Sequence, residues 1–212
     1  MGREGSGALA DALGGSENVL VVAPTGSEPA EAACVAASTV ADPAEALVVG
    51  VAYGVSPEAR IEAWRRTVGT TPKRGVCIAV GEHRRSAAAD GVVPCSPDPG
   101  AGMGVVVDVV SDRTDVGALG ERITRRLADW DYLEGQRILC FHSITAMLEA
   151  VDLQPTFQFL QLLTRQVDHV DGVAHYHLDP DVVGRKARAT LRPLFDVVVT
   201  PDPAGGLSVT EA

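Results

Sequence analysis

The sequence contains few lysines and no apolar run long enough to cross a membrane. Only Lys73 and Lys186 are lysines among 18 basic residues, and 28 acidic residues bring the formal net charge to −10. A membrane-spanning helix needs ~20 apolar residues in succession, and the polar, glycine-rich start of the chain has no signal-peptide core. We therefore expect a cytoplasmic protein without a membrane segment. The net acidity also argues against non-specific binding to nucleic acid or to anionic membranes.

The four cysteines lie far apart, and no two of them form a C-x-x-C pair. Three of the four fall in apolar segments, where a free thiol packs as a small hydrophobic group, so the pattern favours a reducing cytosol. An acidic composition that is poor in lysine and rich in alanine, valine and glycine is typical of proteins that stay soluble at high salt. The composition therefore favours a halophilic source, with a high-GC bacterial protein as the alternative.

Apolar segments alternate with amphipathic segments along the chain, and this alternation predicts an α/β fold. A length of 212 residues suits one domain, which we place at residues 18–212 after a flexible N-terminal tail at 1–17. The expected strands lie at 19–23, 47–52, 76–80, 105–109, 138–141, 173–178 and 195–199, and the expected helices at 28–38, 57–68, 115–130, 154–170 and 181–191. The pattern predicts a three-layer sandwich with helices on both faces of a mainly parallel sheet. A turn at 203–206 and a last strand at 207–210 are expected to form an antiparallel edge hairpin.

The strongest signal lies between Arg137 and Pro180. A buried strand at 138–141 ends in the polar pair His142-Ser143, and a polar turn then leads to a long amphipathic helix from Gln154. After Gly172 a second strand alternates to Leu178, where Asp179-Pro180 ends it. Ligands of parallel sheets bind beyond the carboxyl ends of the strands, so these polar strand ends mark the place to look for a site.

This order of elements resembles the second half of P-loop ATPases of the RecA/KaiC type. The resemblance rests on the strand that ends in a polar residue and Ser-Ile-Thr, the F-x-F-L-x-x-L-T-x-x-V helix and the H-x-H-L-D-P strand. It covers about residues 18–199 and is most similar to a divergent branch found in halophilic archaea. The resemblance implies a RecA/KaiC-like fold, with the Walker A loop after the first strand and the Walker B strand ending at residue 142.

The Walker A pattern G-x-x-x-x-G-K-S/T finds no lysine in this chain. In one register Ala23 and Glu28 take the two glycine positions, while Pro29 and Ala30 take the places of Lys and Ser/Thr. In a second register Gly26 is the second glycine, and Ser27 and Glu28 follow it. Glu28 would then place a carboxylate at the helix N-terminus, where a phosphate would bind. We treat Pro24, Thr25, Gly26, Ser27, Glu28 and Pro29, with His142 and Ser143, as a degenerate nucleotide site.

Two further catalytic parts are missing. His142 stands where the resemblance implies the Walker B aspartate that binds Mg²⁺, an ion that prefers oxygen ligands. Gly54 and Val55 stand where KaiC-like proteins carry paired glutamates. We therefore expect a pseudo-ATPase with no catalytic residues and no bound cofactor. The expected role is that of a regulatory or protein-interaction module with a protein partner or a second copy of the chain, and the alternative is a nucleotide-binding protein with weak or no hydrolysis.

Histidines at the strand ends suggest a third class of function. His175 and His177 alternate on one strand and share a face, and the RecA-type sheet order would place them beside Cys140 and His142. His142, His177 and Asp179 would then be three candidate metal ligands of a metal-binding sensor. The H-x-H-x-D spacing lacks the close ligand spacing of known zinc motifs, so we expect hydrogen-bonding roles and no tightly bound zinc.

Residues 81–104 form the longest segment without periodicity, and their Gly, Pro and Ala content predicts a flexible loop. Limited proteolysis should therefore cut near Arg84 or Arg85 before it cuts the core. The time course of fragments, read by mass spectrometry, checks this expectation. A first cut within residues 154–170 would contradict it.

Overall fold

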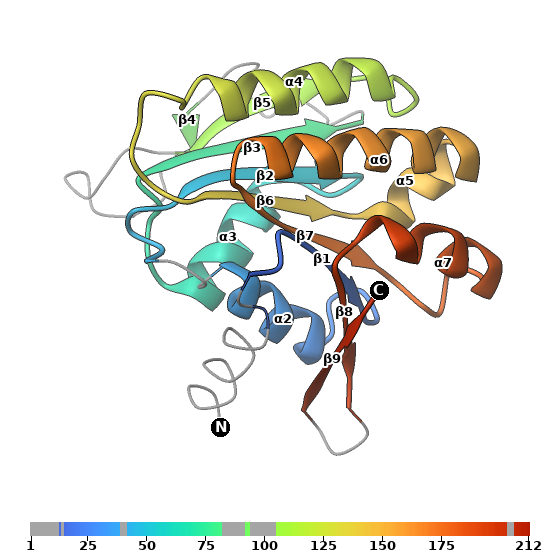
Figure 1. Ribbon diagram of the computed structural model, residues 1–212. Helices are drawn as coiled ribbons and strands as arrows, with labels where there is room; N and C mark the ends of the chain where they lie inside the picture. Colours follow the sequence, from blue (N-terminus) through green and yellow to red (C-terminus); the bar gives the residue numbers. More distant parts are fainter. Residues whose placement is uncertain (1–12, 14, 39–41, 82–91, 94–104, 203–205) are drawn as a thin grey trace.

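The computed structural model describes residues 13, 15–38, 42–81, 92–93, 105–202 and 206–212. In this part of the chain one nine-stranded sheet runs in the order β4-β5-β3-β2-β6-β7-β1-β8-β9 (Figure 1). The pairs β4–β5 and β8–β9 are antiparallel, and every other neighbouring pair is parallel. The strands are β1 (Asn18–Val22), β2 (Leu47–Tyr53), β3 (Arg74–Val80), β4 (Val92–Val93), β5 (Val105–Val110), β6 (Arg137–His142), β7 (Val173–Leu178), β8 (Val197–Pro201) and β9 (Leu207–Glu211).

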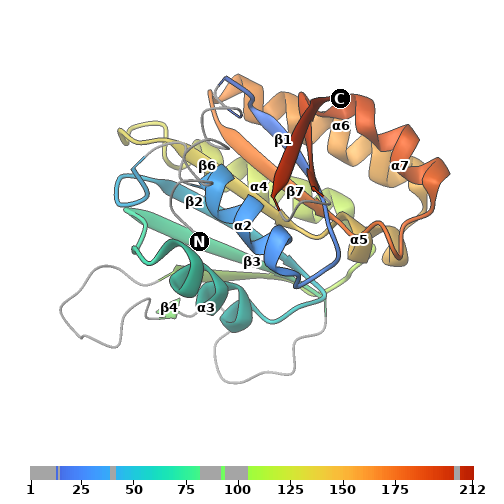
Figure 2. The same cartoon turned by 90° about the horizontal axis from the view of Figure 1, so that it is seen from below.

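Helices cover both faces of the sheet, which gives the predicted three-layer sandwich. One face is covered by α4 (Val116–Ala128) and α6 (Leu153–His169), with the short helices α5 (Ile144–Ala150) and α7 (Arg185–Leu191) beside α6. The other face is covered by α2 (Glu28–Ser38) and α3 (Pro57–Val68), which lie side by side (Figure 2). The expected fold class is confirmed, including the antiparallel pair at the C-terminal end.

The strand β7 lies between β6 and β1 and pairs with both in parallel. Its register sets Cys140 opposite His175 and Phe141 opposite Tyr176 on one side. On the other side Val21 is opposite His177. The neighbourhood expected from the RecA-type resemblance is therefore confirmed, and all three strands end at the same edge of the sheet.

Local sequence signals account for the helix boundaries. Ser56 precedes α3, and its hydroxyl accepts a hydrogen bond from the Ala59 N–H at 3.1 Å. Gly69 ends the same helix with a φ of 76°, a conformation that glycine adopts without a steric penalty. Asp115 caps α4 in the same way as Ser56 caps α3, by accepting from the Ala118 N–H at 2.8 Å.

Three sequence expectations need correction or lie outside the described residues. The segment expected as a polar turn after His142 contains the helix α5, because Ser143 caps it and its apolar residues Ile144 and Met147 are fully buried. Within the expected loop at 81–104 the structure describes Gly81 and the short strand β4, and residues 82–91 and 94–104 lie outside the described part. Most of the expected tail at 1–17 lies outside it as well.

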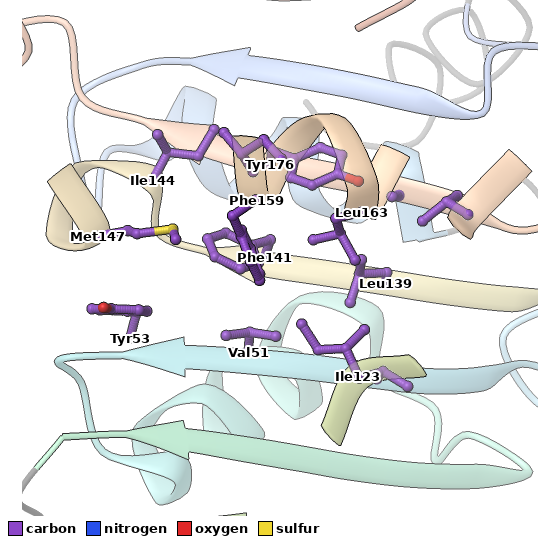
Figure 3. Packing of buried hydrophobic residues seen from close by; sticks show 14 of the residues in the cluster. Val51, Tyr53, Ile123, Leu139, Phe141, Ile144, Met147, Phe159, Leu163 and Tyr176 are labelled. Atoms are coloured by element: carbon purple, nitrogen blue, oxygen red, sulfur yellow. The ribbon is translucent and has the colours of Figure 1, made fainter. Parts of the chain in front are cut away.

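A continuous apolar core fills the space between the sheet and α4, α5, α6 and α7. Phe141 lies at its centre with no exposed surface, and its ring centroid is 5.9 Å from that of Phe159 and 6.0 Å from that of Tyr176 (Figure 3). The alternation of side chains along β6 sends Leu139 and Phe141 to this face and Cys140 and His142 to the other. The core thus fixes which face of β6 carries the polar residues.

Phe141→Ala should lower the free energy of unfolding by about 3–5 kcal/mol, because it removes a fully buried ring and leaves a cavity. Leu162→Ala on α6 is the matched control, since Leu162 is 67% exposed and should change stability by less than about 0.5 kcal/mol. Urea denaturation followed by circular dichroism measures both variants. A loss below about 1 kcal/mol in Phe141→Ala would contradict this account of the core.

Candidate functional site

The strands β1, β2, β6 and β7 all end at one edge of the sheet, which we call the carboxyl edge. The residues at or directly after these strand ends are 23–27, Gly54-Val55, His142-Ser143 and Asp179-Pro180. Parallel pairing brings these segments together even though they are far apart in the sequence. The polar strand ends that the sequence singled out therefore lie together at this edge.

The loop between β1 and α2 uses most of its backbone N–H groups internally. The Ser27 N–H donates to the Pro24 carbonyl at 3.1 Å, and Gly26 adopts a φ of 74° to close this turn. The Ser27 hydroxyl accepts from the Ala30 N–H at 3.4 Å, and the Ser27 carbonyl accepts from the Glu31 N–H at 3.1 Å. Pro29 has no N–H, so the first turn of α2 offers few donors to an anion.

A carboxylate of the protein itself is bound to this loop. Asp179 Oδ2 accepts the Thr25 N–H at 2.7 Å, and Asp179 Oδ1 accepts the Asp181 N–H at 2.9 Å. The Asp179 N–H donates to Thr145 Oγ1 at 2.8 Å, which holds the end of β7 against α5. The hydrogen bond from Thr25 keeps the pKa of Asp179 below its ordinary value, so the side chain is an anion at neutral pH.

The sequence assigned this anionic role to Glu28, and the structure gives it to Asp179 instead. Glu28 is exposed at the first position of α2. Asp179 reaches the loop because β7 pairs with β1, a contact that spans 154 positions of sequence between Thr25 and Asp179. No local pattern in the sequence could have indicated it.

The position expected for Walker B has no anionic oxygen. The side chain of His142 packs against His177 with ring centroids 4.7 Å apart, and burial, followed by the proximity of His177, lowers the pKa of His142 to about 2. His142 is therefore a neutral imidazole. The hydroxyl of Ser143 accepts the Ala146 N–H at 3.1 Å as the cap of α5, so it is engaged in a structural contact.

The other residues considered for an ATPase site also lie in structural contacts or away from the loop between β1 and α2. Gly54 follows β2 with a φ of 74°, and its N–H donates to the Val80 carbonyl at 3.1 Å. Lys73 precedes β3, at the edge opposite to the carboxyl edge, where its ammonium lies 2.8 Å from Glu45 Oε2. Lys186 is exposed on α7. Neither lysine belongs to the loop between β1 and α2.

A small cavity of about 160 Å³ lies between the sheet and the helices α2 and α3. Gly50 of β2 and the small residues Ala30 and Ala63 leave space in its walls, which are mostly apolar, and His142 and His177 are among the polar residues that line it. Sites for drug-sized ligands and cofactors usually enclose about 300–1,000 Å³. The cavity is smaller than this range.

Thiols and imidazoles meet beside this cavity. Cys34 of α2, Cys140 of β6 and both His175 and His177 of β7 each present one ligand atom, and these four atoms lie within 4.8 Å of one another. We call these four residues the thiol–imidazole cluster. The sequence named His142, His177 and Asp179 as candidate ligands, but in the described part of the chain the converging set retains only His177 of the three. Cys34, Cys140 and His175 were missed as ligands because no spacing rule links a helix cysteine to distant strands.

The buried histidines are only partly satisfied by hydrogen bonds. His175 Nε2 lies 3.3 Å from Cys34 Sγ, whereas His175 Nδ1 and His177 Nε2 are buried without a hydrogen-bond partner. The guanidinium of Arg60 on α3 reaches into the same region, with Nη2 3.6 Å from Cys140 Sγ. The fourth cysteine, Cys95, lies outside the described residues, and Cys77 is a buried free thiol in the cavity wall.

The sheet order and the helices on both of its faces are consistent with a RecA/KaiC-like α/β fold. The sequence from residue 16 to residue 201 matches the model of DUF7504, a family of unknown function, and the chain belongs to that family. A search of curated protein sequences finds no match. Among the described residues, no helix combines the length and the apolar character that crossing a membrane requires.

Three solved structures from Pyrococcus horikoshii share the fold. The protein PH0250 has 10% sequence identity and a TM-score of 0.58, with 96% of this chain and 92% of that chain covered. The uncharacterized protein PH0321, solved in complex with an unknown peptide, has 11% identity and a TM-score of 0.55, with 92% and 81% covered. The KaiC-like protein PH0186 has 11% identity and a TM-score of 0.51, with 87% and 70% covered. At these identities the likeness concerns the fold alone.

Asp179→Ala should lower the free energy of unfolding by about 1–3 kcal/mol, because the Thr25 and Asp181 N–H groups lose their acceptor. Asp181→Ala is the matched control, since its side chain is exposed and the described contact uses its backbone. The comparison is made by urea denaturation at one fixed salt concentration. Equal stabilities of the two variants would show that the carboxylate of Asp179 does not hold the loop.

Proposed function

We propose that this protein is a non-catalytic RecA/KaiC-like domain that acts as a regulatory or protein-interaction module in the cytoplasm. The observation that supports this proposal most directly is the hydrogen bond from the Thr25 N–H to Asp179 Oδ2 at 2.7 Å. A P-loop uses such N–H groups to bind phosphate oxygens, and here an internal carboxylate occupies one of them. The missing lysine and the neutral His142 remove two further contributions to phosphoryl transfer.

The charge of the Asp179 carboxylate is expected to weaken nucleotide binding, and Coulomb's law gives the size of this effect. A carboxylate ~4 Å from a phosphate charge costs about 4 kcal/mol at an effective dielectric constant near 20. Since ~1.4 kcal/mol corresponds to a tenfold change in affinity, Asp179 weakens phosphate binding at this loop by up to about a thousandfold. Screening at high salt reduces this penalty, so a thousandfold is the upper end of the range.

A role in protein interaction is consistent with what the fold retains. The sheet, its helices and the continuous core are intact, whereas the catalytic parts are replaced by structural contacts. Among proteins with a similar fold, PH0321 was solved with a bound peptide, which shows that one such fold binds a polypeptide. Exposed apolar side chains of this chain include Leu162 on α6 and Val182 after β7. A halophilic source is part of the same proposal, on the grounds of the acidic, lysine-poor composition.

We expect no phosphate release from ATP above background and no saturable Mg·ATP binding below millimolar concentrations. Titration calorimetry and a phosphate-release assay at high potassium chloride measure the two quantities. Asp179→Asn removes the charge at the loop and should strengthen Mg·ATP binding relative to the wild type. Asp181→Asn makes the same change in net charge at an exposed side chain and should leave binding unchanged.

Two results would contradict the proposal. Micromolar binding of Mg·ATP by the wild type would show that the loop still accepts phosphate and would favour a nucleotide-binding protein. ATP turnover that His142→Ala abolishes would show that a catalytic site has been rebuilt around the histidine.

A further inference from the structure

The thiol–imidazole cluster lies on a face of the sheet that should otherwise be apolar. Inner strands of a parallel sheet are buried on both faces and normally carry apolar residues on both. On the face of α4 and α6 the described apolar residues form one continuous core, whereas on the face of α2 and α3 they fall into three separate groups. The cavity lies where these three groups meet, and Cys140 and His177 line it.

Burial of these side chains is costly without a further partner. His175 has no exposed surface and His177 is 6% exposed, and one ring nitrogen of each is buried without a hydrogen bond. A buried polar group that loses its partner costs about 1–3 kcal/mol. His175 already contacts Cys34 through Nε2, so the ring nitrogen for which an ion at this place would compensate is Nε2 of His177.

The sequence brings the four residues together through three features. Cys140 and His175 are register partners on β6 and β7, and His177 lies two residues further along the same face. The helix α2 faces the sheet with Ala30, Ala33, Ala36 and Ala37, and these small side chains allow it to pack closely. Cys34 therefore reaches His175, 141 positions away in the sequence.

The donor set matches the preferences of one metal ion. Two thiolates and two imidazoles in a tetrahedral arrangement are typical of Zn²⁺. Bond lengths of about 2.0–2.3 Å place the ligand atoms of such a tetrahedron about 3.3–3.8 Å apart. Cys34 Sγ and His175 Nε2 are already 3.3 Å apart, and the other separations, within 4.8 Å, need to close by at most about 1.5 Å.

The charges around Cys140 also suit a metal ligand. Arg60 Nη2, 3.6 Å from Cys140 Sγ, would remain as an outer donor to the ligand sulfur.

We propose that Cys34, Cys140, His175 and His177 form a tetrahedral Zn²⁺ site that ties α2 to the central strands β6 and β7. Four protein ligands leave no open position for a substrate, so the ion has a structural or regulatory role and not a catalytic one. Zinc binding at this site is independent of whether the protein binds ATP, so the inference does not rest on the proposed function. It replaces the sequence expectation that no zinc binds here.

The full chain, purified without added metal, chelator or metal-affinity tag, should contain about one zinc ion per chain by elemental analysis. Chelation followed by titration with Co²⁺ should produce the ligand-field absorption of a tetrahedral site together with a thiolate-to-cobalt charge-transfer band. Cys34→Ser and His177→Ala should each reduce the zinc content and the cobalt signal to background. Removing the ion from the wild type should lower its Tm, and returning zinc should restore it.

Matched variants separate this site from its neighbours. Cys77→Ser changes a buried thiol in the wall of the same cavity, and His142→Ala changes the imidazole that packs against His177, yet both should keep the zinc. Circular dichroism on every variant separates loss of metal from loss of fold. The wild-type Co²⁺ titration needs no variant, so it tests the site even if a substitution prevents folding.

Three outcomes would overturn the proposal. The first is a wild type that contains no zinc as purified and, as reduced protein, shows no tetrahedral cobalt spectrum. The second is zinc that survives Cys34→Ser but is lost in His142→Ala or Asp179→Ala, which would assign the ion to the strand-end set. The third is a Cys34–Cys140 disulfide in the native protein, detected by thiol titration before and after reduction.

Discussion

The pairing of β7 with both β6 and β1 is the interaction on which the rest of the structure depends. It places His175 opposite Cys140, and it carries Asp179 to the loop that follows β1. On the other face the same strand sends Tyr176 into the continuous core, where its hydroxyl donates to Asn18 Oδ1 at 3.0 Å. A shift of one residue in this register would exchange the two faces, burying histidines in the core and moving Tyr176 out of it.

Two faces of one sheet serve different purposes in this protein. The face under α4 and α6 is packed with apolar side chains, and its stability comes from burial of that surface. On the face under α2 and α3, thiols, imidazoles and a guanidinium occupy positions that apolar side chains would otherwise fill. Because unpartnered polar groups are costly there, this face is where a bound ion has the most to contribute.

The carboxyl edge carries the observations on which the proposed lack of catalysis rests. Each segment that would hold a nucleotide takes part in an internal contact: Thr25 binds Asp179, Ser143 caps α5, and Gly54 bonds to Val80. These contacts stabilise the edge without a ligand. A relationship of fold to the KaiC-like protein PH0186 therefore says little about activity, which depends on side chains at these positions.

The sequence by itself determined the order of strands and helices, the buried faces and the absence of a Walker lysine. Those features are local: periodicity shows which face of α4 or α6 is buried, and a motif either contains a lysine or lacks it. It did not reveal α5, because a helix of two turns leaves too short a periodic signal between Ser143 and Asp152.

Only the tertiary structure decided which residues meet. Glu28 lies close to Thr25 along the chain, but the carboxylate that accepts the Thr25 N–H is that of Asp179, because β1 and β7 are neighbours in the sheet. In the sequence, Cys34 and Cys140 are isolated cysteines in apolar segments. The packing of α2 against β7 brings them close to each other. The physical reason is that helix packing and strand register bring together segments that are far apart in the sequence. The spacing of residues within one segment carries no information about such contacts.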